Sequence, residues 1–228
     1  MEAIILAGGF GKRLRELVPD VPKPMAPVAG KPFLEILLTS LAEKGFHRAI
    51  LSVGFRADHI SSHFGEFFAG IKLSYEVEEY PLGTGGAVRA ALQQCRNNHV
   101  YIFNGDTYLD LEVERLEQHW QERGNPVIVC RAVPDVSRYG ALDIKDGAVV
   151  RFLEKGGAGA GIINAGCYIL PVNMLDSYQV GKPFALEADF LAQAVTQQRF
   201  DIFESHGVFI DIGVPADYSR AQILLEGR

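Results

Sequence analysis

Residues 2–15, EAIILAGGFGKRLR, join a short apolar segment to a glycine turn that carries positive charge. The apolar part, 3–7, predicts a buried strand. Three glycines follow almost at once, and then come Lys12 and Arg13. Backbone N–H groups in such a turn can converge on an anion. Since ligands of open α/β sheets bind at the carboxyl ends of strands, this stretch predicts a phosphate site after the first strand.

Three common phosphate-binding loops do not fit this turn. A Walker loop needs Ser or Thr after its Gly-Lys pair, but the chain has Arg13 there. A dinucleotide fingerprint needs a third glycine where the chain has Leu14, and the other motifs of a kinase are missing. A second cation, Lys23, lies between two prolines that restrict its backbone. Two cations on stiff supports suit a triphosphate whose α-phosphorus gains negative charge during attack.

Composition restricts the class of protein. The 228 residues, 48% of them hydrophobic, suffice for one well-packed core. A formal net charge of −6 argues against non-specific nucleic-acid binding, and the apolar runs are too short to span a membrane. The first residues lack the pattern of a signal peptide, and three widely spaced cysteines suggest neither a disulfide framework nor a zinc site. We therefore expect a cytoplasmic protein with neither nucleic-acid nor membrane partners.

Strand-like and helix-like segments alternate along the chain, which predicts an α/β fold with a mostly parallel, doubly wound (Rossmann-like) sheet and helices on both faces. Short strands dominate from about residue 137 and predict a small inserted β-rich lobe. The predicted strands are 3–7, 48–53, 71–77, 100–103, 126–132, 141–144, 149–153 and 162–170, and the predicted helices are 32–44, 58–67, 86–95, 113–122, 186–197 and 215–225. We expect a single domain over 1–228, with its core over about 1–135 and 200–228 and the lobe over about 136–199.

Seven motifs follow one another in this chain. They are AGGFGKRL (7–14), PKPMAPVAGKPFLE (22–35), PLGTGGA (81–87), NGDT (104–107), FLEK (152–155), NAGCYIL (164–170) and FIDIGVPADY (209–218). Together they resemble the sugar-1-phosphate nucleotidyltransferase family, and within it the D-glycero-D-manno-heptose 1-phosphate guanylyltransferases. The resemblance implies transfer of GMP from GTP to a sugar 1-phosphate, with Mg²⁺ as cofactor and a heptose 1-phosphate as the favoured acceptor. Lys12 departs from the family, which usually has Thr or Ser there.

The resemblance also implies roles for individual residues. Arg13 and Lys23 would be the catalytic cations that balance phosphate charge, and Asp106 and Asp211 would hold Mg²⁺. The core would bind the nucleotide and the lobe the sugar. The implied nucleotide-binding residues are Leu6, Ala7, Gly8, Gly9, Gly11, Glu78, Gly83, Thr84 and Asp106. The implied sugar-phosphate-binding residues are Asn104, Gly140, Glu154, Lys155, Asn164, Gly166 and Glu187.

Glu78 would read guanine by accepting from its N1–H and N2–H donors, which uracil and thymine do not present together. Its neighbours Glu76 and Glu79 are alternatives for this role, and all three also fit an exposed acidic strand end. Asp106 and Asp211 also fit turn or helix-capping positions.

Alternatives remain for the function as a whole. The substrate pair could instead be mannose 1-phosphate with GTP, or N-acetylmuramic acid 1-phosphate with UTP. A protein of another class, a catalytically silent nucleotide-sugar sensor, would keep the fold without turnover. The sequence leaves the choice between monomer and homodimer open.

Overall fold

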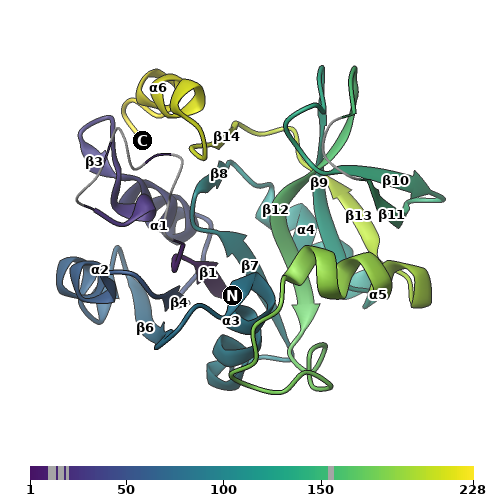
Figure 1. The fold of residues 1–228 in the computed structure, drawn as a ribbon, viewed down its shortest axis with the longest axis horizontal. Helices are drawn as coiled ribbons and strands as arrows, with labels where there is room; N and C mark the ends of the chain where they lie inside the picture. Colours follow the sequence, from purple (N-terminus) through teal and green to yellow (C-terminus); the bar gives the residue numbers. More distant parts are fainter. Residues whose placement is uncertain (10–13, 15–17, 19–20, 154–156) are drawn as a thin grey trace.

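The computed structural model describes residues 1–9, 14, 18, 21–153 and 157–228. A mixed sheet with the strand order β10-β11-β13-β9-β12-β7-β1-β4-β6-β5 forms its centre (Figure 1). The strands of this sheet are β1 (Glu2–Leu6), β4 (Arg48–Val53), β5 (Phe67–Phe68), β6 (Ile71–Val77), β7 (His99–Asn104), β9 (Val127–Val133), β10 (Ala141–Lys145), β11 (Ala148–Leu153), β12 (Gly161–Pro171) and β13 (Asp201–Glu204). Two small antiparallel pairs lie beside it, β2 (Pro27–Val28) with β3 (Lys31–Pro32) and β8 (Thr107–Leu109) with β14 (Phe209–Asp211).

Helices cover both faces of the sheet because its central strands are apolar on both sides. Ile5 of β1 packs in one cluster with the helices α1 (Phe33–Glu43), α2 (Ala57–Phe64) and α4 (Val113–Arg123). Ile4 packs in a second cluster with α3 (Gly83–Ala91) and α5 (Ala192–Gln197). Leu51 and Ile50 of β4 divide in the same way. The doubly wound arrangement predicted from the sequence is therefore confirmed. The chain also forms α6 (Pro215–Leu224), the short 3-10 turns η1 (Lys23–Met25) and η2 (Leu92–Gln94), and the π-helical segment η3 (Leu186–Leu191).

The sheet is less uniformly parallel than the sequence predicts. Strands β7, β1, β4 and β6 run parallel, as does the pair β9–β13. Strand β12 lies antiparallel between β7 and β9, and β10 pairs antiparallel with β11. The segment 136–199, predicted as an inserted lobe, thus contributes its strands to the same sheet as the core.

The helix predicted over 58–67 is shorter than expected. It is α2, which ends at Phe64 because Gly65 has a φ of 61° and a conformation that leaves the helix. Residues 67–68 form β5 and pair with β6. The sequence prediction extended this helix because hydrophobic residues continue past Gly65. The conformation of Gly65 ends the helix before them.

Two other predicted helices differ in detail. The helix predicted from Gly86 begins at Gly83, so the glycine turn forms the first turn of α3. A Cβ at Gly86 would lie 2.7 Å from the Lys182 carbonyl oxygen, so the small residues let the 182–186 segment pack directly on α3. The helix predicted over 186–197 is π-helical over η3 before α5 continues it.

A third apolar cluster joins α1 and α6 to the β8–β14 pair. Tyr108 and Ile210 are buried in this cluster and lie opposite each other in the pair. Asp211 lies opposite Thr107, and the Ile212 N–H donates to the Asp106 carbonyl oxygen at 2.9 Å. The two predicted metal ligands are therefore brought together by β8 and β14 and not by neighbouring strands of the main sheet. Over the described residues, the helices are too short or too polar to cross a bilayer.

Candidate active site

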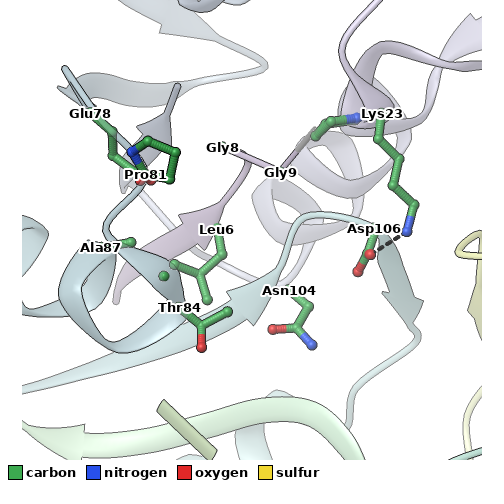
Figure 2. A pocket seen from close by; sticks show the side chains of 12 residues that line it. Leu6, Gly8, Gly9, Lys23, Glu78, Pro81, Thr84, Ala87, Asn104 and Asp106 are labelled. Carbon is green, nitrogen blue, oxygen red and sulfur yellow. Dashed lines mark hydrogen bonds and ion pairs between the residues drawn. The ribbon is translucent and has the colours of Figure 1, made fainter. Parts of the chain in front are cut away.

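A pocket of about 360 Å³ opens where β1 ends and the glycine turn begins (Figure 2). Leu6 ends β1, Asn104 ends the adjacent strand β7, and the first turn of α3 supplies Gly83 and Thr84. The pocket is lined by Leu6, Gly8, Gly9, Lys23, Pro24, Glu78, Pro81, Gly83, Thr84, Ala87, Asn104 and Asp106. All of the described residues predicted to bind nucleotide are in this set except Ala7, which is buried and donates its N–H to the Ser52 carbonyl oxygen at 2.8 Å.

Glu78 lies at one end of this pocket, just after β6 (Figure 2). Its Oε1 accepts from the Ser52 hydroxyl at 3.2 Å, and its Oε2 accepts from the Leu82 N–H at 2.9 Å. A Cβ at Gly8 would lie 2.6 Å from Oε1, so Gly8 must be glycine for the carboxylate to take this position. These contacts fix the carboxylate at the wall of the pocket.

The two alternative glutamates lie elsewhere. Glu76 accepts from the Gln94 amide at 2.7 Å, and Glu79 is exposed. Neither lines the pocket. Of these three glutamates, Glu78 is therefore the one that lines the pocket.

Lys23 enters from the other side of the pocket (Figure 2). It begins η1 between the buried residues Pro22 and Pro24, which restrict the backbone on both sides. Its Nζ forms an ion pair with Oδ2 of Asp106, and the Lys23 side chain is only 12% exposed. The predicted catalytic cation and one predicted metal ligand are thus in direct contact.

Asp211 completes this group of charges. Burial, together with the negative charge of Asp106, raises the pKa of Asp211, while Lys23 opposes the shift. The Gly213 N–H donates to its Oδ1 at 2.6 Å. A carboxylate with a raised pKa beside a second carboxylate gains from any added positive charge.

The pair Asp106 and Asp211 fits a hard divalent cation. Mg²⁺ is usually held by one or two carboxylates together with substrate phosphates and water. Over the described residues, the structure contains no group of three or more His, Cys, Asp or Glu side chains placed to hold a metal. An ion held by these two carboxylates would therefore complete its coordination with substrate phosphate and water.

A second pocket of about 630 Å³ meets the first at Asn104, which lines both. It includes all five described residues that the sequence assigns to the sugar phosphate. These are Asn104, Gly140, Asn164, Gly166 and Glu187. Asp211 lies in the same lining, together with Thr107, Arg138, Tyr139, Phe152, Leu153, Ala165, Ala188, Ala192 and Phe209. The carboxylate pair thus spans the two pockets, with Asp106 in the first and Asp211 in the second.

A chain of hydrogen bonds connects the two pockets. The Leu186 N–H donates to the Thr84 hydroxyl at 2.8 Å, and that hydroxyl donates to Glu187 Oε2 at 3.1 Å. The buried Tyr168 hydroxyl donates to Glu187 Oε1 at 3.1 Å and accepts from the Asn164 amide at 2.6 Å. Glu187 is therefore held from both sides, so its position depends on α3 as well as on β12.

Four predicted site residues, Gly11, Arg13, Glu154 and Lys155, lie outside the described residues. The structure adds pocket residues that the sequence analysis missed, above all Arg138 and Tyr139. They immediately precede Gly140, which the sequence analysis had already assigned to the site. This adjacency is the sequence signal that could have identified them. Tyr168 was missed because a tyrosine in an apolar strand reads as core.

The doubly wound sheet, the glycine turn and the paired pockets define a class of enzyme that handles nucleotides and phosphorylated sugars. The chain belongs to the nucleotidyl transferase family, which matches residues 2–226. It is 39% identical over 223 residues to the D-glycero-alpha-D-manno-heptose 1-phosphate guanylyltransferase of Aneurinibacillus thermoaerophilus, covering 97% of each chain.

Two further proteins are similar to this chain over nearly all of its residues. The crystal structure of HddC from Yersinia pseudotuberculosis is 38% identical with a TM-score of 0.88, covering 97% of this chain and 98% of that chain, and HddC has also been solved complexed with GMP-PN. The mannose-1-phosphate guanylyltransferase of Mycobacterium tuberculosis is 32% identical over 226 residues, which are 96% of this chain but 63% of that protein.

Proposed function

We propose that this protein transfers GMP from GTP to D-glycero-α-D-manno-heptose 1-phosphate, giving GDP-heptose and pyrophosphate. The observation that carries the proposal is the junction at Asn104, where a pocket with a glycine turn meets a second pocket whose polar lining groups suit a sugar. Lys23, Asp106 and Asp211 lie together at that junction, where charge must be balanced. The full-length similarity to heptose 1-phosphate guanylyltransferase supports the choice of substrates.

The reaction needs no nucleophile from the protein. An oxygen of the sugar phosphate attacks the α-phosphorus of GTP, a new P–O bond forms, and the bond to the β-phosphate oxygen breaks as pyrophosphate leaves. The work of the protein is to hold both phosphates in line and to balance negative charge. Lys23 donates to the α-phosphate from its rigid support, and we propose Arg13 and Lys155 as further phosphate-binding cations.

Mg²⁺ is the proposed cofactor, and it would neutralise phosphate charge when bound. Asp106 and Asp211 would hold it, one from each pocket. In the structure described here, Lys23 pairs with Asp106, and binding of GTP would shift the ammonium toward the phosphate.

Glu78 is the proposed reader of the base. A carboxylate has about four lone-pair sites, so Glu78 can keep its bonds to Ser52 and Leu82 and still accept from guanine. Uracil and thymine lack the paired N1–H and N2–H donors, and their binding would leave the carboxylate without these partners. We also propose that the protein works in the cytoplasm, where GTP is available.

The test is pyrophosphate release with Mg²⁺, crossing GTP, UTP, ATP, CTP and dTTP with the 1-phosphates of heptose, mannose and N-acetylmuramic acid. We expect release with GTP and the heptose 1-phosphate. Release with mannose 1-phosphate at equal kcat/KM would change the acceptor, and release with UTP alone would overturn the role of Glu78. If the protein bound GTP but released no pyrophosphate with any of these acceptors, the alternative function, a catalytically silent nucleotide-sugar sensor, would be favoured.

A further inference from the structure

The second pocket has one charged feature that the mechanism above does not use. Among its described lining residues, Arg138 is the cation, and Glu187 and Asp211 are the acids. A sugar 1-phosphate carries close to two negative charges at neutral pH, by analogy with other phosphate monoesters. When the acceptor enters, the positive charge of Arg138 is therefore needed to offset the repulsion between the phosphate and Asp211.

Arg138 is held in place by a buried carboxylate. Its Nη2 donates to Oδ2 of Asp217 in the first turn of α6, and Arg220 Nη1 donates to the other oxygen at 2.9 Å. The Asp217 side chain is only 2% exposed, whereas that of Arg138 is 44% exposed. A solvent-facing guanidinium is thus anchored on a rigid, buried partner, which reduces the entropy lost when a ligand binds it.

Donors remain for a ligand after this anchoring. The guanidinium has five N–H groups in a planar fork, and the bond to Asp217 uses one of them. The Arg138 guanidinium carbon lies 5.6 Å from the centre of the Tyr139 ring, and Tyr139 packs edge-on against Phe209. All three side chains line the pocket. The hydrogen bond to Asp217 is the main cause that raises the pKa of Arg138, and the charge of Asp211 adds to it, so the cation lies within electrostatic range of Asp211.

We propose that Arg138 binds the phosphate of the sugar 1-phosphate, and that Asp217 is the positioning residue that aims it. The inference rests on the proposed function and adds these two residues to those that would hold the acceptor. Arg138 would also offset the repulsion between Asp211 and the incoming dianion, so that the acceptor oxygen can approach the α-phosphorus.

The test compares Arg138→Ala and Arg138→Lys with Arg220→Ala, which removes the other arginine on the same carboxylate. We expect Arg138→Ala to raise the KM for the sugar 1-phosphate about 10- to 100-fold and to leave the KM for GTP within about threefold. Arg138→Lys should lie between it and wild type, because a lysine keeps the charge without the fork. Asp217→Asn should raise the same KM, and Arg220→Ala should not.

Direct binding separates this inference from the proposed function. Calorimetry with the heptose 1-phosphate and a non-hydrolysable GTP analogue measures acceptor affinity without turnover. Wild type that binds the acceptor but releases no pyrophosphate would overturn the proposed function alone. Equal acceptor affinity in wild type and Arg138→Ala, with a melting temperature that falls as it does in Arg220→Ala, would overturn the inference, because Arg138 would then only anchor α6.

Discussion

In its proposed role as a metal ligand, Asp211 would serve function at a cost in stability. Burial and the charge of Asp106 raise its pKa in the folded chain, so keeping it ionised opposes folding. The Gly213 N–H bond compensates only in part. Such an electrostatic cost is expected where a carboxylate is placed to bind a cation beside a phosphate and does not contribute to the stability of the unliganded protein.

Asp211→Asn is therefore expected to raise the melting temperature at neutral pH and to abolish turnover. The gain in stability should be small below the ordinary carboxyl pKa of about 4, grow as the pH rises toward the raised pKa, and stay constant above it. Thermal melts from pH 4 to 8 test this. The control is Asp143→Asn, which removes the same charge from an exposed pair with Arg151. A variant less stable than wild type at every pH would contradict the prediction.

The proposed role of Glu78 in base recognition can be tested with one conservative substitution. Glu78→Gln replaces one acceptor oxygen with an NH₂ donor, which would face the N–H groups of guanine. We expect the KM for GTP to rise about 10- to 100-fold, with less discrimination against UTP. Glu79→Gln is the matched control, since Glu79 is adjacent, exposed and outside the pocket. Unchanged GTP kinetics in Glu78→Gln would remove Glu78 from base recognition.

At the scale of elements, α3 and η3 act as one unit. Thr84 accepts from the Leu186 N–H and donates to Glu187, so one hydroxyl joins the first pocket to the second. Thr84→Val would leave the Leu186 donor without this partner, at a cost of about 1–3 kcal/mol. We expect the KM values for both substrates to rise, because Glu187 loses one of its two supports.

Urea unfolding and steady-state kinetics measure the effects of Thr84→Val. Thr196→Val serves as the control, because its hydroxyl makes an exposed bond to the Gln193 carbonyl oxygen within one helix. A Thr84→Val enzyme with wild-type kinetics for both substrates would show that the link does not position Glu187.

Local pattern predicted most elements of this fold and failed where tertiary contacts decide. Strands 48–53 and 71–77 have the predicted bounds, because alternation or an apolar run specifies a strand directly. The start of α3 at Gly83 was missed because glycines disfavour helix, and only the packing of 182–186 on Gly86 shows why they are there.

The site divides in a similar way. The family resemblance pointed to Lys23, Glu78 and Asp106, which line one pocket. The sequence analysis missed Arg138, because its proposed role depends on the buried carboxylate of Asp217, which lies 79 positions away in the chain. Contacts across such separations leave no local pattern in a single sequence.

At the scale of the whole molecule, the segment 136–199 is interleaved with the rest of the sheet (Figure 1). Strand β12 belongs to that segment, yet it pairs with β7 on one side and β9 on the other. The lobe therefore cannot unfold alone without breaking two ladders in the centre of the sheet and exposing residues of both large apolar clusters, such as Cys167 and Tyr168.

We accordingly predict that the chain unfolds as one cooperative unit, which is the behaviour expected of a small single domain. Trp120, the one tryptophan, reports on the first apolar cluster from α4, and far-UV circular dichroism reports on all helices and strands. Their urea transitions should coincide, and GTP should shift both midpoints by the same amount, because a ligand that binds only the native state stabilises the whole unit. If the heptose 1-phosphate shifted the urea midpoint of one probe and not of the other, the segment 136–199 would fold separately from the rest of the chain. Strand β12 would then have to leave the sheet before the core unfolds.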